Sequence, residues 1–234
     1  MLALGLVVLV IGLVLAAPYA LRFFSRTQSN STAPIGRWFD DPSSRPELIT
    51  IRDKTACPGA PFILPSDGFI GLLYRDPAAP YDALNRHTGV DIFGDGQPGT
   101  IPVYAAYEGY LSRLPDWFAT VIIRHDDPLQ PGRTIWTYYT HMGSADGTQS
   151  YVADDFPPGT DAVWVEQGTL IGYQGDFGGS YAVGLHLHFS IVLSDDDGRF
   201  KNEARIANTL DPSPYLGMTL NIADLPQRPI GCQK

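Results

Sequence analysis

The chain has 234 residues, of which 24 are glycine, 20 are proline and 12% are aromatic, while only 18% are charged. This length suits one domain with appended segments, and this composition is typical of a loop-rich β protein and excludes a coiled coil, a helical bundle and a disordered chain. The net charge of −9 comes without a basic cluster, which argues against nucleic acid as a partner.

The first 21 residues form an apolar segment without a charged side chain. As a helix that rises about 1.5 Å per residue, residues 1–21 would cross the ~30 Å hydrocarbon core of a bilayer. A cleaved signal peptide is the alternative, but the segment lacks a basic start and Pro18 directly follows its small-residue pair. We therefore expect one N-terminal transmembrane helix as an anchor. Arg22 and Arg26 follow it and would favour the cytoplasm for that side, so its orientation stays open.

Residues 22–56 are rich in serine and proline with scattered charges, which is typical of a linker that buries little surface. The compact part is expected to begin near Cys57, with a main domain over 57–195 and an irregular tail over 196–234 that packs on the domain. Cys57 and Cys232 lie near the two ends of this part. In an exported chain they could form a disulfide, and two unpaired buried thiols are the alternative.

Short runs of β-forming residues, separated by glycine, proline and aspartate, make up most of the compact part. We expect strands over Phe69–Tyr74, Ile101–Ala106, Tyr110–Leu114, Thr120–His125, Thr134–His141, Ala162–Val165, Leu170–Tyr173 and Leu185–Leu193. Their close spacing leaves no room for crossover helices, so the sequence predicts an all-β domain with a compact, largely antiparallel sheet. The long polar segment 142–161 is expected to border a cleft.

The histidines fall into motifs that suggest a metal site. His186 and His188 are two residues apart in a strand, so their side chains project from the same face. His87 and Asp91 form an H-x-x-x-D motif, and His141 ends another strand. Two imidazoles and one carboxylate, with a fourth position open for water, are the layout of a catalytic zinc site. Each motif alone is weak, but the three in this order indicate such a site.

The order H-x-x-x-D, Tyr-x-His and H-x-H resembles the lysostaphin/LytM-type zinc metallopeptidases, which cleave peptide cross-links of bacterial cell walls. The stretch 103–106 with Gly109 is similar to the strand that follows the first motif in this family. The stretch 165–172 with Gly175 is similar to the glycine-rich approach to H-x-H. The resemblance covers residues 62–193 and implies a compact antiparallel β fold with the metal in a groove.

The resemblance also implies roles for single residues. It implies one Zn²⁺ held by His87, Asp91 and His188. It makes His141 and His186 the two catalytic histidines that do not bind the metal, and it leaves open which of them is the base and which stabilises the oxyanion. All five positions are filled in this chain, which is consistent with an active enzyme.

The sequence indicates the roles of two further residues, Tyr81 and His125, less specifically. Tyr81 lies six residues before His87, where some members of the family have a tyrosine that supports the transition state, and Tyr74 is the alternative. His125 lies at a strand end beside two acids, where we expect a surface or packing residue rather than a catalytic one. The long segment 142–161 and the extended tail depart from the family pattern, which affects substrate preference more than chemistry.

The function that the resemblance implies is a zinc-dependent endopeptidase that hydrolyses stem or cross-bridge peptides of peptidoglycan. We expect it in the bacterial cell envelope, outside the cytoplasm and anchored to the membrane, or secreted if the first segment is cleaved. A non-catalytic module of the same fold, which binds the wall or regulates another wall hydrolase, is the alternative, and a protein substrate also stays open. A cupin is disfavoured because residues 189–197 lack the required glutamate, and an H-E-x-x-H motif is absent.

Overall fold

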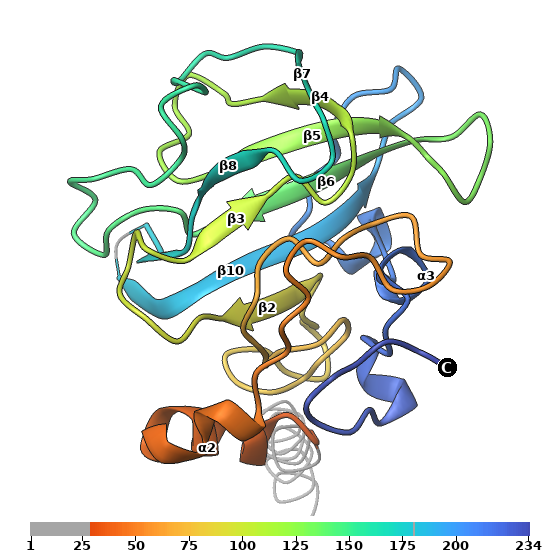
Figure 1. Ribbon diagram of the computed structural model, residues 1–234. Coiled ribbons are helices and arrows are strands. Elements are labelled where there is room, and N and C mark those ends of the chain that lie inside the picture. Colours follow the sequence, from red (N-terminus) through yellow and green to blue (C-terminus); the bar gives the residue numbers. More distant parts are fainter. Residues whose placement is uncertain (1–28, 180) are drawn as a thin grey trace, which may run out of the picture.

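The computed structural model describes residues 29–179 and 181–234 (Figure 1). The predicted membrane helix over residues 1–21 lies outside this part of the chain. None of the helices within the described residues combines the length and the apolar character that are needed to span a bilayer.

Antiparallel strands dominate the described residues, as the sequence predicted (Figure 1). The main sheet has the order β1-β2-β10-β6-β5-β4-β7, and β9 and β11 also pair with β10, while β3 and β8 form a second small sheet. The strands are β1 (Phe69–Ile70), β2 (Val90–Phe93), β3 (Pro102–Tyr104), β4 (Gly109–Ser112), β5 (Val121–Asp126), β6 (Thr134–Thr140), β7 (Val163–Val165), β8 (Leu170–Tyr173), β9 (Gly175–Phe177), β10 (Ala182–Leu193) and β11 (Thr209–Leu210). The sequence pattern predicted no strand at β2 or β9, because both are short and lack a regular apolar alternation.

The core lies between one face of the main sheet and the small β3–β8 sheet. In β10, Leu187, Phe189 and Ile191 are fully buried in this core, together with Val103 of β3 and Ile171 of β8. Each such side chain contributes about 1.5–3 kcal/mol when it is fully buried. Because side chains alternate along a strand, the residues between these apolar positions project from the opposite face of the sheet.

Residues 29–56 are ordered on the domain, which corrects the expectation of a linker that buries little surface. Helix α2 (Thr32–Asp40) and the 3₁₀ helix η1 (Pro42–Glu47) precede the first strand. Trp38 is only 2% exposed and stacks on Phe69 at 5.3 Å between ring centroids. Serine and proline obscured the helix in the sequence, although a proline in the first turn of a helix is tolerated.

The C-terminal tail forms part of the core as well as covering it. It contains η2 (Ile206–Asn208), β11, α3 (Ser213–Leu216) and η3 (Ile222–Asp224). Its buried apolar residues join the main core, and these are Tyr215, Leu216, Met218, Leu220, Ile222 and Ile230. Cys57 and Cys232 form a disulfide with 5.4 Å between their Cα atoms, which ties the end of the tail to the start of the domain.

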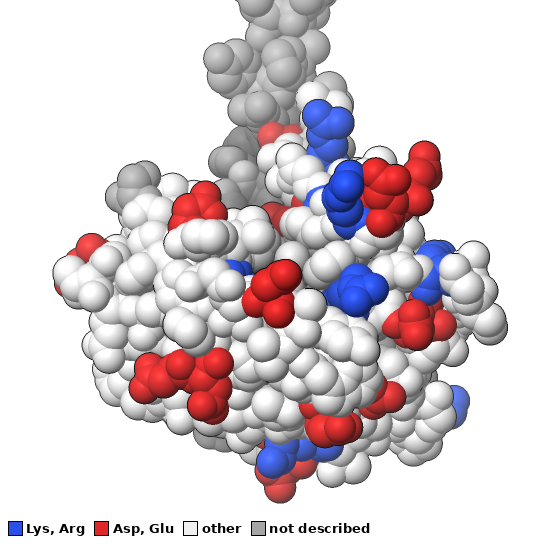
Figure 2. All heavy atoms as spheres, turned by 90° about the horizontal axis from the view of Figure 1, so that it is seen from above, with Lys and Arg blue, Asp and Glu red and all other residues white. Residues whose placement is uncertain are grey.

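The face shown in Figure 2 is largely uncharged, with acidic side chains scattered over it and basic ones gathered mainly on one side. Acidic groups exceed basic ones in the whole chain, 25 against 16. On this face, the basic side chains are separated by uncharged and acidic ones and do not merge into one continuous basic surface.

Candidate metal centre

Three neighbouring strands place polar side chains on the outer face of the main sheet. In the register between β2 and β10, Asp91 lies opposite His188. On the other side of β10, His188 lies opposite Thr140 at the end of β6. Directly opposed residues of antiparallel strands project from the same face with Cβ atoms about 4.5–5.5 Å apart. The alternation that sends Leu187 and Phe189 into the core therefore gathers these polar residues on the other side.

His87 lies just before β2 and is fixed through its main chain. Its N–H donates to the carbonyl oxygen of Asp76 at 3.1 Å, and its own carbonyl accepts from the N–H of Arg75 at 2.8 Å. Between His87 and β2, Gly89 passes so close to β10 that a Cβ atom would lie 2.1 Å from the carbonyl oxygen of Phe189. Only glycine fits there, and this close approach brings the two halves of the H-x-x-x-D motif against β10.

The three predicted ligands meet at one point. The Nε2 atom of His87 lies 3.0 Å from Oδ1 of Asp91 and 3.0 Å from Nδ1 of His188. The Nδ1 atom of His188 lies 2.8 Å from the same Oδ1. All three side chains are buried, and together they form a group that could hold a metal ion.

The chemistry of this donor set fits a divalent cation. The Nδ1 atom of His87 lies 2.9 Å from the carbonyl oxygen of Leu73, which can only accept, so Nδ1 carries the proton and Nε2 presents a lone pair to Asp91. Lone pairs from two imidazoles and a carboxylate that converge in this way repel one another unless a cation or a proton lies between them. Two nitrogens and one oxygen are a ligand set that Zn²⁺ takes in catalytic sites.

Asp91 and His188 are in contact, and each strongly shifts the pKa of the other. Burial opposes ionisation of Asp91, but His87 and His186, together with hydrogen bonds from the imidazoles, hold its pKa well below the usual value. Burial likewise opposes protonation of His188, yet Asp91 and Glu203 raise its pKa to about 10. Without a metal, the carboxylates therefore retain a proton on His188, and a divalent cation would compete with this proton.

The two other histidines of the motifs lie beside the ligand group without joining it. The rings of His141 and His186 are 4.5 Å apart between centroids, and Nε2 of His186 is 3.8 Å from Oδ1 of Asp91. Each ring has its Nδ1 atom next to a main-chain carbonyl, at 2.8 Å from Phe177 and 2.9 Å from Gly184. A carbonyl only accepts, so both rings carry the proton on Nδ1 and leave Nε2 free as an acceptor.

Burial is the main reason why both of these histidines are neutral at pH 7. It lowers the pKa of His141 to about 3, helped by the neighbouring imidazoles His186 and His188. It lowers the pKa of His186 as well, against the opposing effect of Asp91. His141 also has a positive φ of 74°, a backbone conformation that non-glycine residues rarely adopt and that is often found at functional sites.

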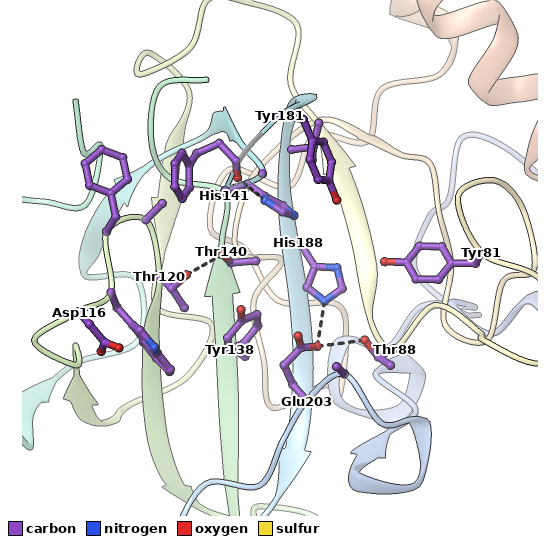
Figure 3. A pocket seen from close by; sticks show the side chains of 18 of the residues that line it. Tyr81, Thr88, Asp116, Thr120, Tyr138, Thr140, His141, Tyr181, His188 and Glu203 are labelled. Atoms are coloured by element: carbon purple, nitrogen blue, oxygen red, sulfur yellow. Dashed lines mark hydrogen bonds and ion pairs between the residues drawn. The ribbon is translucent and has the colours of Figure 1, made fainter. Parts of the chain in front are cut away.

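Of the two candidate tyrosines, Tyr81 lies at the site and Tyr74 does not. Tyr81 packs against His87 at 4.8 Å between ring centroids, and its hydroxyl points into the cavity towards the imidazoles (Figure 3). Burial raises its pKa, and so does the nearby negative charge. Tyr74 instead donates its hydroxyl to the carbonyl of Thr209, away from this cavity. His125 is buried, with both ring nitrogens hydrogen-bonded, so it is a packing residue.

The histidines lie between two cavities that share Tyr81, His141 and His188 in their lining. The larger has a volume of about 470 Å³ and a mixed wall, in which Glu203 and Thr140 lie together with apolar side chains (Figure 3). The smaller has a volume of about 320 Å³ and a mainly apolar wall, which includes Ile35, Phe39, Leu72, Phe93 and Val183. A chain segment laid across the ligand group would have one cavity on each side of it.

The segment 142–161 lines neither of these two cavities, which corrects the expectation that it borders the cleft. It is held against the domain by the buried Arg113, which donates to the carbonyl of Phe156 at 2.9 Å and to Oγ of Ser150 at 3.0 Å. Buried Val152 and Phe156 anchor it in the core. The guanidinium satisfies two polar groups of the segment, and Asp146 accepts further hydrogen bonds from Ser144 and Thr148 within it.

Sequence reasoning missed two parts of the site, Glu203 in the tail and α2 with Ile35 and Phe39. Glu203 is 115 positions from its hydrogen-bond partner Thr88 and carries no local motif. The spacing of Ile35, Trp38 and Phe39 follows a helical period, and this signal could have revealed α2.

No family model and no curated protein matches the chain. Among solved structures it resembles lysostaphin from Staphylococcus simulans, with 23% identity and a TM-score of 0.38 over 58% of this chain and 45% of that one. It also resembles the catalytic domain of the prophage-encoded M23 protein EnpA from Enterococcus faecalis, with 21% identity and a TM-score of 0.37 over 63% and 92% of the two chains.

A third structure, from Pseudomonas aeruginosa and provisionally described as a peptidase M23, matches with 21% identity and a TM-score of 0.39 over 69% of this chain and 52% of that one. The chain thus spans about half the length of lysostaphin and of the Pseudomonas protein. Identities of 21–23% and TM-scores of 0.37–0.39 are low, and these likenesses concern the fold alone. At the level of the fold, many of the structural neighbours of this chain are peptidases of the lysostaphin and M23 type.

Proposed function

We propose that this protein is a zinc-dependent endopeptidase that hydrolyses peptide bonds in the stem or cross-bridge peptides of peptidoglycan. The observation that carries the proposal is the convergence of His87, Asp91 and His188 on one point, with two neutral histidines beside them and a cavity on each side. Three protein ligands leave a fourth position for water, as catalytic zinc requires, whereas a structural zinc site is closed by four ligands.

Zinc held by these three residues would polarise the scissile carbonyl and lower the pKa of bound water towards about 7. The protein contributes acceptors and donors around it. The Nε2 atom of either His141 or His186 could accept a proton from the attacking water and later deliver it to the leaving amine. The other imidazole, once it is protonated on Nε2, and the hydroxyl of Tyr81 would stabilise the negative charge that develops on the carbonyl oxygen.

The substrate class rests on the resemblance of the motifs to cell-wall peptidases and on the shape of the site. The two cavities beside the ligand group suit an extended chain that continues on both sides of the cleaved bond, as in an endopeptidase. A disulfide suits an oxidising compartment. We therefore propose that the domain acts in the bacterial cell envelope outside the cytoplasm, with residues 1–21 as its membrane anchor.

The test uses the full chain purified in detergent. We expect close to one equivalent of bound zinc and release of peptides from purified peptidoglycan that stops with a chelator and returns with added zinc. Mass spectrometry of the released peptides identifies the bond that is cut. A chain without zinc affinity contradicts the proposal. Zinc binding without release from several types of wall would instead favour a non-catalytic module that binds the wall or regulates another hydrolase.

A further inference from the structure

Glu203 approaches the metal centre from the C-terminal tail and has not been assigned a role so far. Its Oε2 atom lies 3.7 Å from Nε2 of His188 and accepts a hydrogen bond from Oγ1 of Thr88 at 3.1 Å (Figure 3). Its side chain is 21% exposed, so it lies mostly inside the wall of the larger cavity. The tail thus brings a second carboxylate to the side of His188 that faces away from the other ligands.

The imidazole of His188 needs a partner on this side. Its Nδ1 atom faces Asp91 and His87, so this nitrogen must present its lone pair when a metal is bound. The remaining proton then lies on Nε2, which is buried and has no hydrogen-bond partner among the described residues. A buried donor without an acceptor costs about 1–3 kcal/mol. A movement of less than about 1 Å by either side chain would bring Nε2 and Oε2 within hydrogen-bonding distance.

We propose that Glu203 is a positioning residue for the metal ligand His188: its carboxylate accepts the Nε2 proton, fixes the ring with Nδ1 towards the metal, and is itself held by Thr88. Ligating histidines commonly donate their second N–H to a carboxylate, which fixes the tautomer and makes the imidazole a better ligand. This inference rests on the proposed zinc site and adds to it a residue outside the sequence motifs.

Charge balance supports the same role. The ligand group contains one carboxylate, Asp91, and two imidazoles, so a divalent cation held by these residues alone would leave one net positive charge in a buried site. Glu203 supplies the second negative charge at a distance where it does not occupy a coordination position. A buried divalent cation with two carboxylates around it is neutral overall, which lowers the cost of its desolvation.

The test measures metal affinity and ligand geometry in addition to catalysis. The full-length chain carries Glu203→Ala, Glu203→Gln or Thr88→Val. Glu166→Ala is the matched control, because Glu166 is exposed and its carboxylate accepts a hydrogen bond from Trp164 in β7, away from the metal site. Zinc affinity is measured by competition with a chromophoric chelator, and the absorption spectrum of the Co²⁺-loaded chain reports the ligand field. Circular dichroism checks that each variant is folded.

We expect Glu203→Ala to bind zinc about 10–100-fold more weakly than the unchanged chain and to shift the Co²⁺ spectrum. Glu203→Gln should recover part of this loss, because its amide oxygen can still accept the Nε2 proton although it carries no charge. Thr88→Val should weaken zinc binding less than Glu203→Ala, and Glu166→Ala should leave it unchanged. A loss of affinity caused by general damage to the fold would also change the circular dichroism of Glu203→Ala, whereas loss of the Nε2 partner alone would leave it unchanged.

Two negative results can be told apart. If the unchanged chain binds zinc and Glu203→Ala binds it equally well with the same Co²⁺ spectrum, the role of Glu203 is wrong while the proposed function stands. If the unchanged chain binds neither metal, the proposed zinc site itself is wrong, and the inference on Glu203 is overturned with it.

Discussion

The two histidines of the H-x-H motif lie two residues apart on one strand face but have different surroundings. His188 directs Nδ1 to the ligand group, while the Nδ1 atom of His186 is used in a hydrogen bond to Gly184. His186 is therefore left with Nε2, which is 3.8 Å from Asp91 and free to exchange a proton. The hydrogen bond to the carbonyl of Gly184 thus gives His186 a different free nitrogen from the one that His188 presents to the ligand group.

This difference predicts opposite behaviour of two single variants. His188→Ala should abolish zinc binding and, with it, peptide release. His186→Ala should keep close to one equivalent of zinc and lose most of the turnover, because a positioned general acid–base group contributes about 10²–10⁴-fold. Metal analysis of both purified variants, together with peptide release, checks this. Equal loss of zinc in both variants would contradict the division of roles.

His125 predicts a dependence of stability on pH that is independent of the metal. Burial lowers its pKa to about 4. The unfolded chain, in which a histidine titrates near about 6.5, therefore takes up the proton more readily than the folded protein, and the folded state loses stability as the pH falls from about 6.5 to 4. The loss from this residue should reach about 3 kcal/mol at the lower end.

Urea unfolding of the metal-free chain at pH 7 and at pH 4.5 measures this effect. A His125→Gln variant lacks the titrating group, so its free energy of unfolding should change less between the two pH values than that of the unchanged chain. The same change in both proteins would show that other groups cause the pH dependence.

At the scale of the elements, α2 closes one side of the site although it precedes the β domain. Trp38 stacks on Phe69 of β1, and Phe39 packs edge-on against Phe93 of β2. The ring of Phe93 in turn stacks on His186 at 5.0 Å between centroids. The helix therefore connects to His186 through one layer of aromatic rings and lines the smaller cavity.

Removing the buried anchor of α2 should destabilise the protein. We expect Trp38→Ala to lower the free energy of unfolding by about 3–5 kcal/mol, because it leaves a cavity between the helix and β1. Arg37→Ala on the exposed side of the same helix should cost less than about 1 kcal/mol, since its ion pair with Glu47 is exposed. Urea unfolding compares the two variants, and equal effects would mean that α2 is held by something other than Trp38.

The exposed neighbour of this anchor tests the role of α2 in substrate binding. Phe39 is 49% exposed and lines the smaller cavity. Phe39→Ala should raise KM for a peptide substrate several-fold, because apolar wall is lost, and should leave zinc content unchanged. Steady-state kinetics with metal analysis checks this, and unchanged KM would show that the substrate does not reach this cavity.

At the scale of the whole molecule, the tail and the disulfide join parts that are far apart in the sequence. Cys57 and Cys232 are separated by 175 residues, and between them the tail adds apolar side chains to the core and Glu203 to the metal centre. Closing so long a loop restricts the unfolded chain strongly. The bond therefore stabilises the fold and keeps the tail, which carries Glu203, on the domain.

Loss of the disulfide should therefore reduce stability. We expect Cys57→Ala combined with Cys232→Ala to lower the free energy of unfolding by about 2–5 kcal/mol. Chemical unfolding of this variant and of the unchanged chain measures it, and mass spectrometry of unreduced peptides shows whether the two cysteines are joined in the unchanged chain. Two free thiols in the protein isolated from an oxidising compartment would contradict the bond.

The sequence by itself determined the antiparallel β class and the five motif residues, because both depend on local order. Period-two alternation places His186 and His188 on one face, and the spacing of His87 and Asp91 is readable without a structure. The helix in residues 32–40 and the extent to which the tail enters the core were not predicted, since serine, proline and irregular spacing hide a helix and apolar residues that are stabilised only by tertiary packing.

Only the tertiary structure decided which atoms meet. The register of β2 against β10 sets Asp91 opposite His188, and hydrogen bonds to main-chain carbonyls select the nitrogen that each imidazole presents. Glu203 reaches the site from the tail over a long separation in the chain, and no local pattern encodes such a contact. Contacts of this kind depend on the free energy of the whole fold, whereas strand faces and motifs depend on a few neighbouring residues.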